Sequence, residues 1–187
     1  MTATTTTLPR SRLRARFVLA ALVACGLAAL AWAAFVQPSA RIVYNPSDSV
    51  PVGWYRIEPA HSLPGALHVG SIVLTTLPAD AAALAAQRGY LPSHIPLLKR
   101  VGAVAPQHVC IVNGIVRIDG VPVAAVLRTD RWGRPLSSWP PCRQLAEGEL
   151  FLLSVTNPAS FDSRYFGPVS AAAVLGVARP IRLETQP

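Results

Sequence analysis

The chain has 187 residues, of which 51% are hydrophobic and 14% are charged, with 18 prolines and a net charge of +8. This length leaves room for one domain with its own core once a leader and a membrane segment are set aside, and the frequent proline disfavours a helical bundle. Half of the net charge comes from four arginines near the N-terminus, and no basic run with interleaved aromatic residues follows, which disfavours nucleic-acid binding.

The first predicted element is an apolar segment, residues 17–36, which contains no charged residue. Its length is enough to cross a bilayer as one helix, and Trp32 and Phe35 near its end suit a membrane interface. The arginines that precede it are Arg10, Arg12, Arg14 and Arg16.

The positive charge before this segment predicts its orientation. The positive-inside rule puts residues 1–16 in the cytoplasm as a basic leader and residues 37–187 outside as an extracytoplasmic domain. Two other interpretations stay open. Ala31-Trp32-Ala33 could be the cut site of a cleaved signal peptide, and Leu22-Val23-Ala24-Cys25 resembles a lipoprotein signal.

The outer part is predicted to be a mainly β domain, an antiparallel and barrel-like sheet with one small helix. The helix is expected at residues 79–88, because the segment is rich in alanine and is followed by Gly89. Strands are expected as two strands within residues 41–58, then at 71–76, 97–105 and 149–155, and as a final pair within 169–183.

The clearest local signal is a double hairpin at residues 109–123, VCIVNGIVRIDGVPV. Asn113-Gly114 and Asp119-Gly120 are two-residue turns between β-branched runs. A loop rich in proline and tryptophan is expected at residues 131–143.

Cys110 and Cys142 both lie in the part expected outside the membrane. A pair of cysteines in an oxidising compartment is typical of a disulfide, although two unpaired buried thiols stay possible. Such a bond would close a loop of about thirty residues and contribute about 3 kcal/mol in the chain-entropy model.

Candidate chemistry begins with the bases that could activate a serine. The four histidines stand in no recognisable triad or metal motif, so neither a metal nor another cofactor is expected; they are His61, His68, His94 and His108. Lys99, the sole lysine, lies in an apolar run, and a lysine becomes a general base when burial lowers its pKa. An exposed strand lysine is the plainer alternative.

Three sequence boxes then occur in order: Ser47-Asp48-Ser49-Val50-Pro51, Lys99-Arg100-Val101 and a third box over residues 162–167, DSRYFG. They resemble the serine, lysine and Asp-Ser-Arg boxes of type I (leader) signal peptidases, which use a serine–lysine dyad. The order and spacing extend this resemblance over residues 10–180. The compressed serine box, the Arg-Gly-Tyr-Leu-Pro step before Lys99 and Gly148-Glu149 are similar to the conjugative-transfer branch, the TraF-like peptidases that mature pilins.

The resemblance implies a role for each matching residue. Ser49 would be the nucleophile and Lys99 the general base, while the Ser49 N–H and the Ser47 hydroxyl would form the oxyanion hole. Ser160 would hydrogen-bond the lysine amine. Asp162 and Arg164 would form a supporting ion pair.

Two departures from the family pattern concern the surroundings of the site. Val50 stands where the family has methionine, and residues 154–158 (SVTNP) replace the Gly-Asp-Asn-Arg-Asp lead-in to the last box. The second departure affects the local support expected for Lys99.

The sequence therefore predicts a membrane-anchored serine endopeptidase in the inner membrane of a bacterium, single-pass, with a periplasmic catalytic domain. Its expected partners are the lipid bilayer and precursors that carry signal peptides, a pilin among the candidates. Release of the product by water or by an amine that cyclises it stays open. The alternative is a non-enzymatic component of a secretion or conjugation apparatus, anchored by one helix and binding through a β edge.

The predicted orientation has a direct test. A reporter fused after Pro187 should be active only if it is exported, and an antibody to residues 1–16 should reach its target only in opened cells. A mature chain that begins near Ala34 would instead support a cleaved signal peptide.

Overall fold

The computed structural model describes residues 10–35, 41–59, 67–139 and 142–184. The chain divides into two compact units, Met1–Ser39 and Ala40–Pro187, and the first of these contains helix α1.

Helix α1 spans Arg10–Phe35, and its stretch Arg14–Trp32 is long and apolar enough to cross a membrane. It starts before the predicted segment because the arginines, leucine and alanine that precede Phe17 are good helix formers. Residues 1–9 of the expected leader and Val36 lie outside the described residues.

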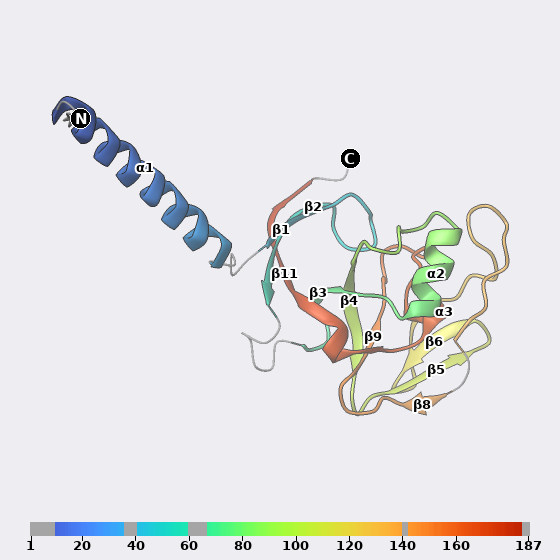
Figure 1. The fold of residues 1–187 in the computed structure, drawn as a ribbon. Helices are drawn as coiled ribbons and strands as arrows, with labels where there is room; N and C mark the ends of the chain where they lie inside the picture. The colour runs from blue at the N-terminus through green and yellow to red at the C-terminus, as the bar shows by residue number, and fades with distance from the viewer. Residues whose placement is uncertain (1–9, 36–40, 60–66, 140–141, 185–187) are drawn as a thin grey trace, which may run out of the picture. The chain divides into compact units, whose positions relative to one another are not determined.

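The second unit is built on two antiparallel sheets, so the mainly β prediction is confirmed (Figure 1). The larger, strongly curved sheet has seven strands in the order β1-β2-β11-β3-β4-β9-β10. Its strands are β1 (Arg41–Asn45), β2 (Gly53–Pro59), β3 (Ile72–Thr75), β4 (Leu97–Val104), β9 (Glu149–Leu152), β10 (Val169–Ser170) and β11 (Val174–Leu183).

The smaller sheet has the order β7-β6-β5-β8 and contains the predicted double hairpin. Its strands are β5 (His108–Val112), β6 (Ile115–Ile118), β7 (Val121–Ala125) and β8 (Arg143–Gln144). Asn113 and Asp119 have φ of 53° and 49°, and the glycine after each also has positive φ. These angles are those of the predicted two-residue turns.

Helix α2 (Ala79–Gln87) lies where the alanine-rich segment predicted it and buries Ala81 and Ala85. The prediction of one small helix in this domain was incomplete, because a second, α3 (Ser163–Phe166), begins at the third sequence box. Asp162 caps α3 by accepting a hydrogen bond from the Arg164 N–H, a local contact that stabilises a helix too short for propensity to reveal.

The predicted final strand pair was wrong in its pairing. Strand β10 pairs with β9, whereas β11 pairs with β2 and β3. A 3₁₀ turn, Ala171–Ala173, separates the two strands and directs the chain to the other part of the sheet. Because β11 inserts between β2 and β3, it joins the β1–β2 hairpin to β3, and β3 in turn pairs with β4, the strand that carries the lysine box.

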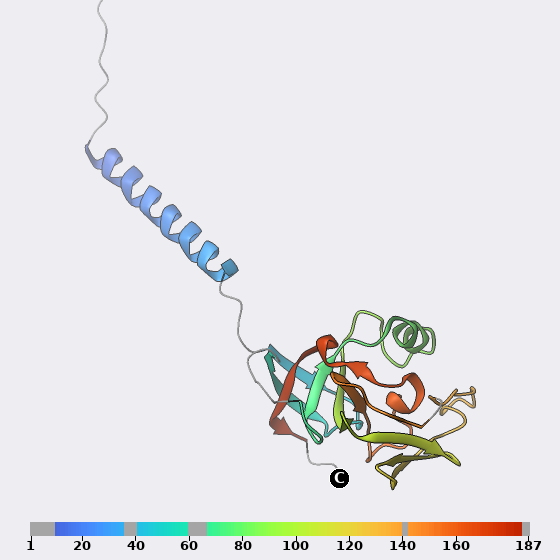
Figure 2. The same cartoon turned by 90° about the horizontal axis from the view of Figure 1, so that it is seen from below.

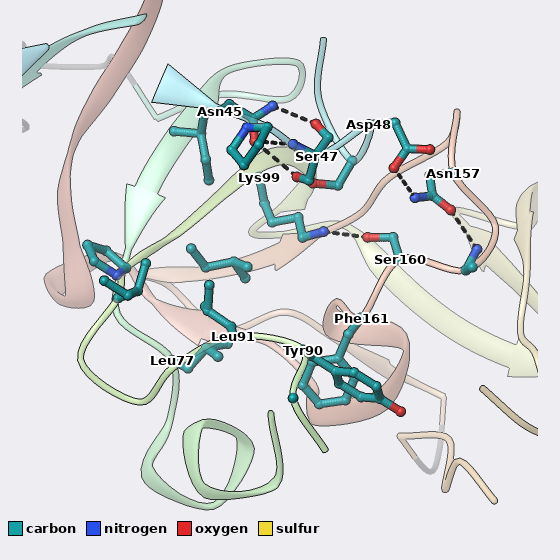
Figure 3. Close-up of a pocket in the computed structure, with 18 of the residues that line it drawn as sticks. Asn45, Ser47, Asp48, Leu77, Tyr90, Leu91, Lys99, Asn157, Ser160 and Phe161 are labelled. Carbon is teal, nitrogen blue, oxygen red and sulfur yellow. Dashed lines mark hydrogen bonds between the residues drawn. The ribbon is translucent and has the colours of Figure 1, made fainter. Parts of the chain in front are cut away.

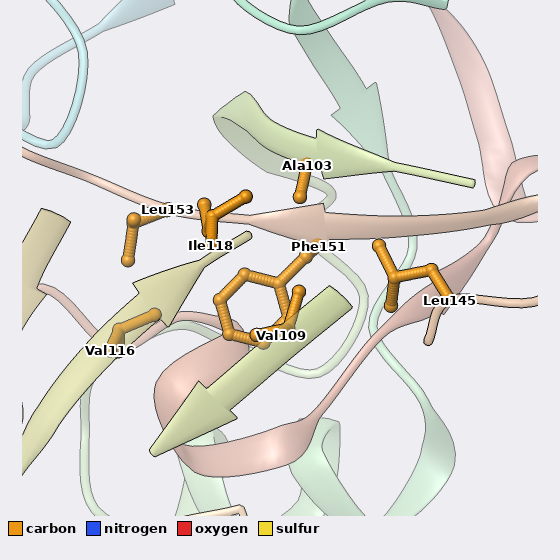
Figure 4. Close-up of a cluster of buried hydrophobic side chains, with 7 residues drawn as sticks. All are labelled: Ala103, Val109, Val116, Ile118, Leu145, Phe151 and Leu153. Atoms are coloured by element: carbon orange, nitrogen blue, oxygen red, sulfur yellow. The ribbon is translucent and has the colours of Figure 1, made fainter. Parts of the chain in front are cut away.

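The hydrophobic core is divided between three clusters of buried side chains. One lies between the small sheet and the β4–β9 pair and is centred on Phe151 (Figure 4). The other two pack against the large sheet, around Tyr55 and around Val101. Each fully buried large side chain contributes roughly 1.5–3 kcal/mol, so the clusters hold β4 and β9 firmly in place. Figure 2 shows the small sheet and the β1–β2–β11 end of the large sheet at opposite ends of this domain.

The disulfide between Cys110 and Cys142 is present, as predicted. Cys110 lies on β5, and Cys142 directly precedes β8, which pairs with β5 through Val109 and Arg143. The bond therefore fastens the end of the long β7–β8 connection to the small sheet.

Loss of this bond should lower stability more than chemistry. Replacing both cysteines by serine is expected to lower the melting temperature by roughly 5–10 °C, because the unfolded chain gains about 3 kcal/mol of conformational freedom. Thermal unfolding of the purified variant measures the change, and mass mapping without reductant tests the bond itself. An unchanged melting temperature would contradict a stabilising role.

Candidate active site

The serine box forms a tight loop between β1 and β2. The hydroxyl oxygens of Ser47 and Ser49 are 3.0 Å apart and hydrogen-bonded. Ser49 is buried, with 7% of its surface exposed. The loop is tied to the last residue of β1 by the Asn45 side chain, whose amide bonds Ser47 and two further backbone carbonyls.

Lys99 comes from the middle of β4, between β3 and β9. Alternation along the strand puts Lys99, Val101 and Ala103 on one buried face. Only 3% of the surface of Lys99 is exposed, so the plainer alternative of an exposed strand lysine is wrong.

The electrostatics of this position favour a neutral amine. The pKa of Lys99 is lowered from 10.5 to about 8, chiefly by burial; the charge of Arg164 also lowers it, while Asp162 and Asp48 act in the opposite direction. The largest effect is the loss of hydration of the ammonium form. A sizeable fraction of Lys99 is therefore able to accept a proton at slightly alkaline pH.

The amine of Lys99 is oriented by Ser160, because Nζ donates a hydrogen bond to Ser160 Oγ (Figure 3). Ser160 is itself buried and lies in the loop between β9 and α3. This contact matches the arrangement that the sequence resemblance implied for the two residues.

Asp162 and Arg164 form a fully buried ion pair beneath this loop. Asp162 accepts hydrogen bonds from Arg164 Nε at 2.8 Å and Nη2 at 2.9 Å, and from the Ser154 N–H at 3.0 Å. Arg164 also donates to the carbonyl oxygens of Ser160 at 3.0 Å and Ala125 at 2.7 Å. Every charged group is thus paired, which a buried ion pair requires.

Replacement of the family's lead-in does not leave this loop unsupported. Ser154 Oγ accepts a hydrogen bond from the Asn157 N–H, and Asn157 Nδ2 donates to Asp48 Oδ1 at 2.5 Å. The loop before α3 is thereby connected to the serine loop across the site.

Ser47, Ser49, Lys99 and Ser160 line one cavity of about 450 Å³. Its opposite wall is apolar and aromatic, and Figure 3 shows the side chains that form it: Leu77, Leu91, Tyr90 and Phe161. Asp162 and Arg164 are not among the lining residues, and none of the histidines in the described part of the chain is; His61 lies outside that part. The mostly apolar lining suits an apolar ligand.

The two candidate dyad residues have separate hydrogen-bond partners. Ser49 Oγ is bonded to Ser47, and Lys99 Nζ to Ser160, whereas no hydrogen bond in the described part of the chain joins Ser49 to Lys99 directly. Catalytic hydrogen bonds are often long before substrate binds, so this arrangement does not exclude proton transfer between the two.

Two structural contributions were missed by the sequence analysis. Asn45 was not singled out from the sequence, although its NPS sequence is typical of an asparagine that bonds its own loop. The β7–β8 connection forms one rim of the cavity, because Asp130 accepts hydrogen bonds from Tyr90 OH and Arg134 Nε. The ring of Trp132 is stacked on that of Tyr90. Sequence separation of about forty residues gave no signal for this contact.

No group of three or more metal-ligating side chains is present in the residues that the structure describes.

Comparison with known proteins gives a consistent picture. The profile of the family described as signal peptidase, peptidase S26, matches residues 14–182. A plasmid transfer protein TraF of Escherichia coli is 32% identical over 180 residues, covering 91% of this chain and 95% of that protein. A conjugal transfer protein TraF of Agrobacterium fabrum is 38% identical over 151 residues, covering 73% of this chain and 80% of that protein.

Among solved structures, a signal peptidase I from Enterococcus faecalis is similar with a TM-score of 0.38 and 21% identity. The likeness covers 59% of this chain and 95% of that one.

The lowered pKa of Lys99 can be measured without interference, because the chain contains no other lysine. Protein labelled with ¹³C-lysine should give one side-chain signal that titrates with a midpoint near 8, instead of near 10.5 as in a solvated lysine. Denatured protein serves as the control and should return the midpoint to the solvated value. A midpoint above 10 in the folded protein would contradict the buried neutral amine.

Proposed function

The chain belongs to the signal peptidase family, peptidase S26, and from this premise we propose that it is a membrane-anchored serine endopeptidase. It removes signal or leader peptides from exported precursors, with Ser49 as nucleophile and Lys99 as general base. Helix α1, the one helix of the described residues that is long and apolar enough to cross a bilayer, is its membrane anchor. Residues 1–16 are cytoplasmic, residues 17–36 form the membrane segment, and residues 37–187 form the periplasmic catalytic domain of this inner-membrane protein.

The observation that carries the proposal is the buried Lys99 amine in one cavity with the Ser49 hydroxyl. A binding component of a secretion apparatus would have no use for an ionisable amine at this depth, because burial of an ammonium is costly. A general base gains from the same burial, since only the neutral amine accepts a proton.

The chemistry follows the usual course of acyl transfer by an activated serine. Lys99 Nζ takes the Ser49 proton as Oγ adds to the scissile carbonyl. The resulting oxyanion accepts hydrogen bonds from the Ser49 N–H and from a hydroxyl donor such as that of Ser47. The protonated amine then gives its proton to the departing amino group. Water activated by neutral Lys99 adds to the acyl-enzyme and restores Ser49, so protons and bonds balance over the cycle.

Position and lining support the substrate class. About a dozen residues separate Val36 from Ser49, which limits the reach of the nucleophile to about 45 Å from the end of the apolar segment. The apolar cavity wall suits the small and apolar residues before a signal-peptide cut site.

The names of the similar proteins support a role in conjugation. Both E. coli and Agrobacterium relatives are called transfer proteins TraF, and the likeness extends over most of each chain. We therefore infer that the substrate is an exported component of a conjugative apparatus, with a pilin as the first candidate.

Loss of either dyad residue should abolish cleavage. Ser49→Ala and Lys99→Ala are each expected to lower processing at least a thousandfold, and the double variant should be scarcely worse, because nucleophile and base act as a unit. The measurement is conversion of an exported precursor with an Ala-x-Ala cut site in cells that make each variant at normal level.

Lys99→Arg is the matched control, because it keeps a cation but cannot supply a neutral base. It should be inactive, while the wild-type rate should rise with pH through a midpoint near 8. Normal processing by any one of the three single variants would rule out the dyad.

A further inference from the structure

The Asn45 side chain has more hydrogen-bond partners than any other residue of the serine loop. Its Nδ2 lies 2.6 Å from the carbonyl oxygen of Ser47, 3.1 Å from that of Val50 and 3.2 Å from that of Pro51. Its Oδ1 faces the N–H of Ser47 at 3.3 Å and the Ser47 hydroxyl at 3.0 Å. Asn45 is 5% exposed and ends β1, so this network is held by the sheet.

These partners fix which way round the amide lies. The Ser47 N–H can only donate, so the atom that faces it must be the amide oxygen. The three carbonyl oxygens can only accept, so the atom that faces them must be the amide nitrogen. Both ends of the amide agree, and no other orientation satisfies the loop.

The orientation of Asn45 also fixes the direction of the bond between the two serines. An amide oxygen cannot donate, so the Ser47 hydroxyl uses its one proton on Asn45 Oδ1. The bond between Ser47 Oγ and Ser49 Oγ must then use the proton of Ser49. In this state the nucleophile donates to Ser47, and the lone pairs of Ser47 Oγ lie toward it.

We propose that Asn45 is a positioning residue that acts on the nucleophile through Ser47. It holds the Ser47 hydroxyl at a fixed place and as an acceptor, so that Ser49 Oγ is kept in one rotamer inside the cavity. The inference rests on the proposed function, because it assigns a role relative to Ser49 as nucleophile.

The same arrangement defines what substrate must do to use Ser47 as an oxyanion donor. The Ser47 proton can reach an oxyanion only if it leaves Asn45 Oδ1, since a hydroxyl has one proton. Developing negative charge is a stronger acceptor than a neutral amide oxygen, so the exchange is favourable in the transition state and not before it. In the ground state, Asn45 thus keeps the Ser47 hydroxyl proton bonded to its own Oδ1.

The test is a double-mutant cycle on the purified full-length protein in detergent, with a quenched peptide that carries Ala-x-Ala before the scissile bond. Asn45→Ala is expected to lower kcat at least tenfold with little change in KM, because the amide acts on Ser49 and not on substrate. Adding Asn45→Ala to Ser47→Ala should change kcat by less than threefold, because the effect passes through Ser47. A smaller loss in the single variant, or a larger further loss in the double variant, would overturn the proposal.

Tyr55→Phe is the matched control for simple loop anchoring. The Tyr55 hydroxyl donates to the Pro51 carbonyl at 2.5 Å, so its removal loosens the same loop without touching Ser47. It should lower thermal stability while kcat stays within threefold. A tenfold loss of kcat in Tyr55→Phe would show that anchoring alone explains the effect.

Asn45→Gln covers the case in which Asn45→Ala does not accumulate. It keeps an amide donor for the loop carbonyls but moves the amide oxygen away from Ser47 by one methylene group, so kcat should fall at least tenfold. A kcat within threefold of wild type overturns the proposal. Ser49→Ala distinguishes the two levels of inference: if it remains active the proposed function fails, whereas inactivity of Ser49→Ala with full activity of Asn45→Ala removes only the role of Asn45.

Discussion

The buried pair of Asp162 and Arg164 is the contact on which the arrangement of this domain depends. Arg164 donates to Ala125 at the end of β7, to Ser160 in the loop beside Lys99, and to Asp162 at the start of α3. One guanidinium therefore connects the small sheet, the loop beside Lys99 and helix α3. Removing either charge would leave the other unpaired in the interior and lower the free energy of unfolding by roughly 3–5 kcal/mol. Because Arg164 bonds the Ser160 carbonyl and Ser160 bonds Lys99, the orientation of the Lys99 amine also depends on this ion pair.

Local signals predicted the parts of the fold that local physics decides. The turns at Asn113-Gly114 and Asp119-Gly120 require positive φ, and the residues there adopt it at little cost, so the double hairpin could be located from the sequence. Helix α2 could likewise be predicted from its alanines. The pairing of β10 and β11 was not, because the partner of a strand is chosen by packing over long sequence distances. Helix α3 escaped notice because its stability comes from an ion pair and a cap.

The candidate site divides in the same way. Ser49, Lys99 and Ser160 could be named from box order, and they line one cavity. The apolar neighbours of Lys99 left both burial and exposure open, and the family resemblance favoured the buried position that the structure has. Asn45 was passed over because an asparagine before proline is read as a turn residue. Its five contacts exist only once the loop has folded back on β1.

The chain's use of arginine in place of lysine has a consequence for how its charge varies with pH. Of the 17 basic Lys and Arg residues, one is lysine, and guanidinium groups keep their proton far into the alkaline range. Between pH 8 and 10 the positive charge carried by these 17 side chains therefore changes at Lys99 and nowhere else. Electrostatic attraction of an anionic lipid or peptide to the arginine-bearing surface stays constant while the interior amine loses its proton. Among these side chains, a change of pH in this range therefore alters only the charge of the buried Lys99 amine and leaves the long-range attraction of charged partners unchanged.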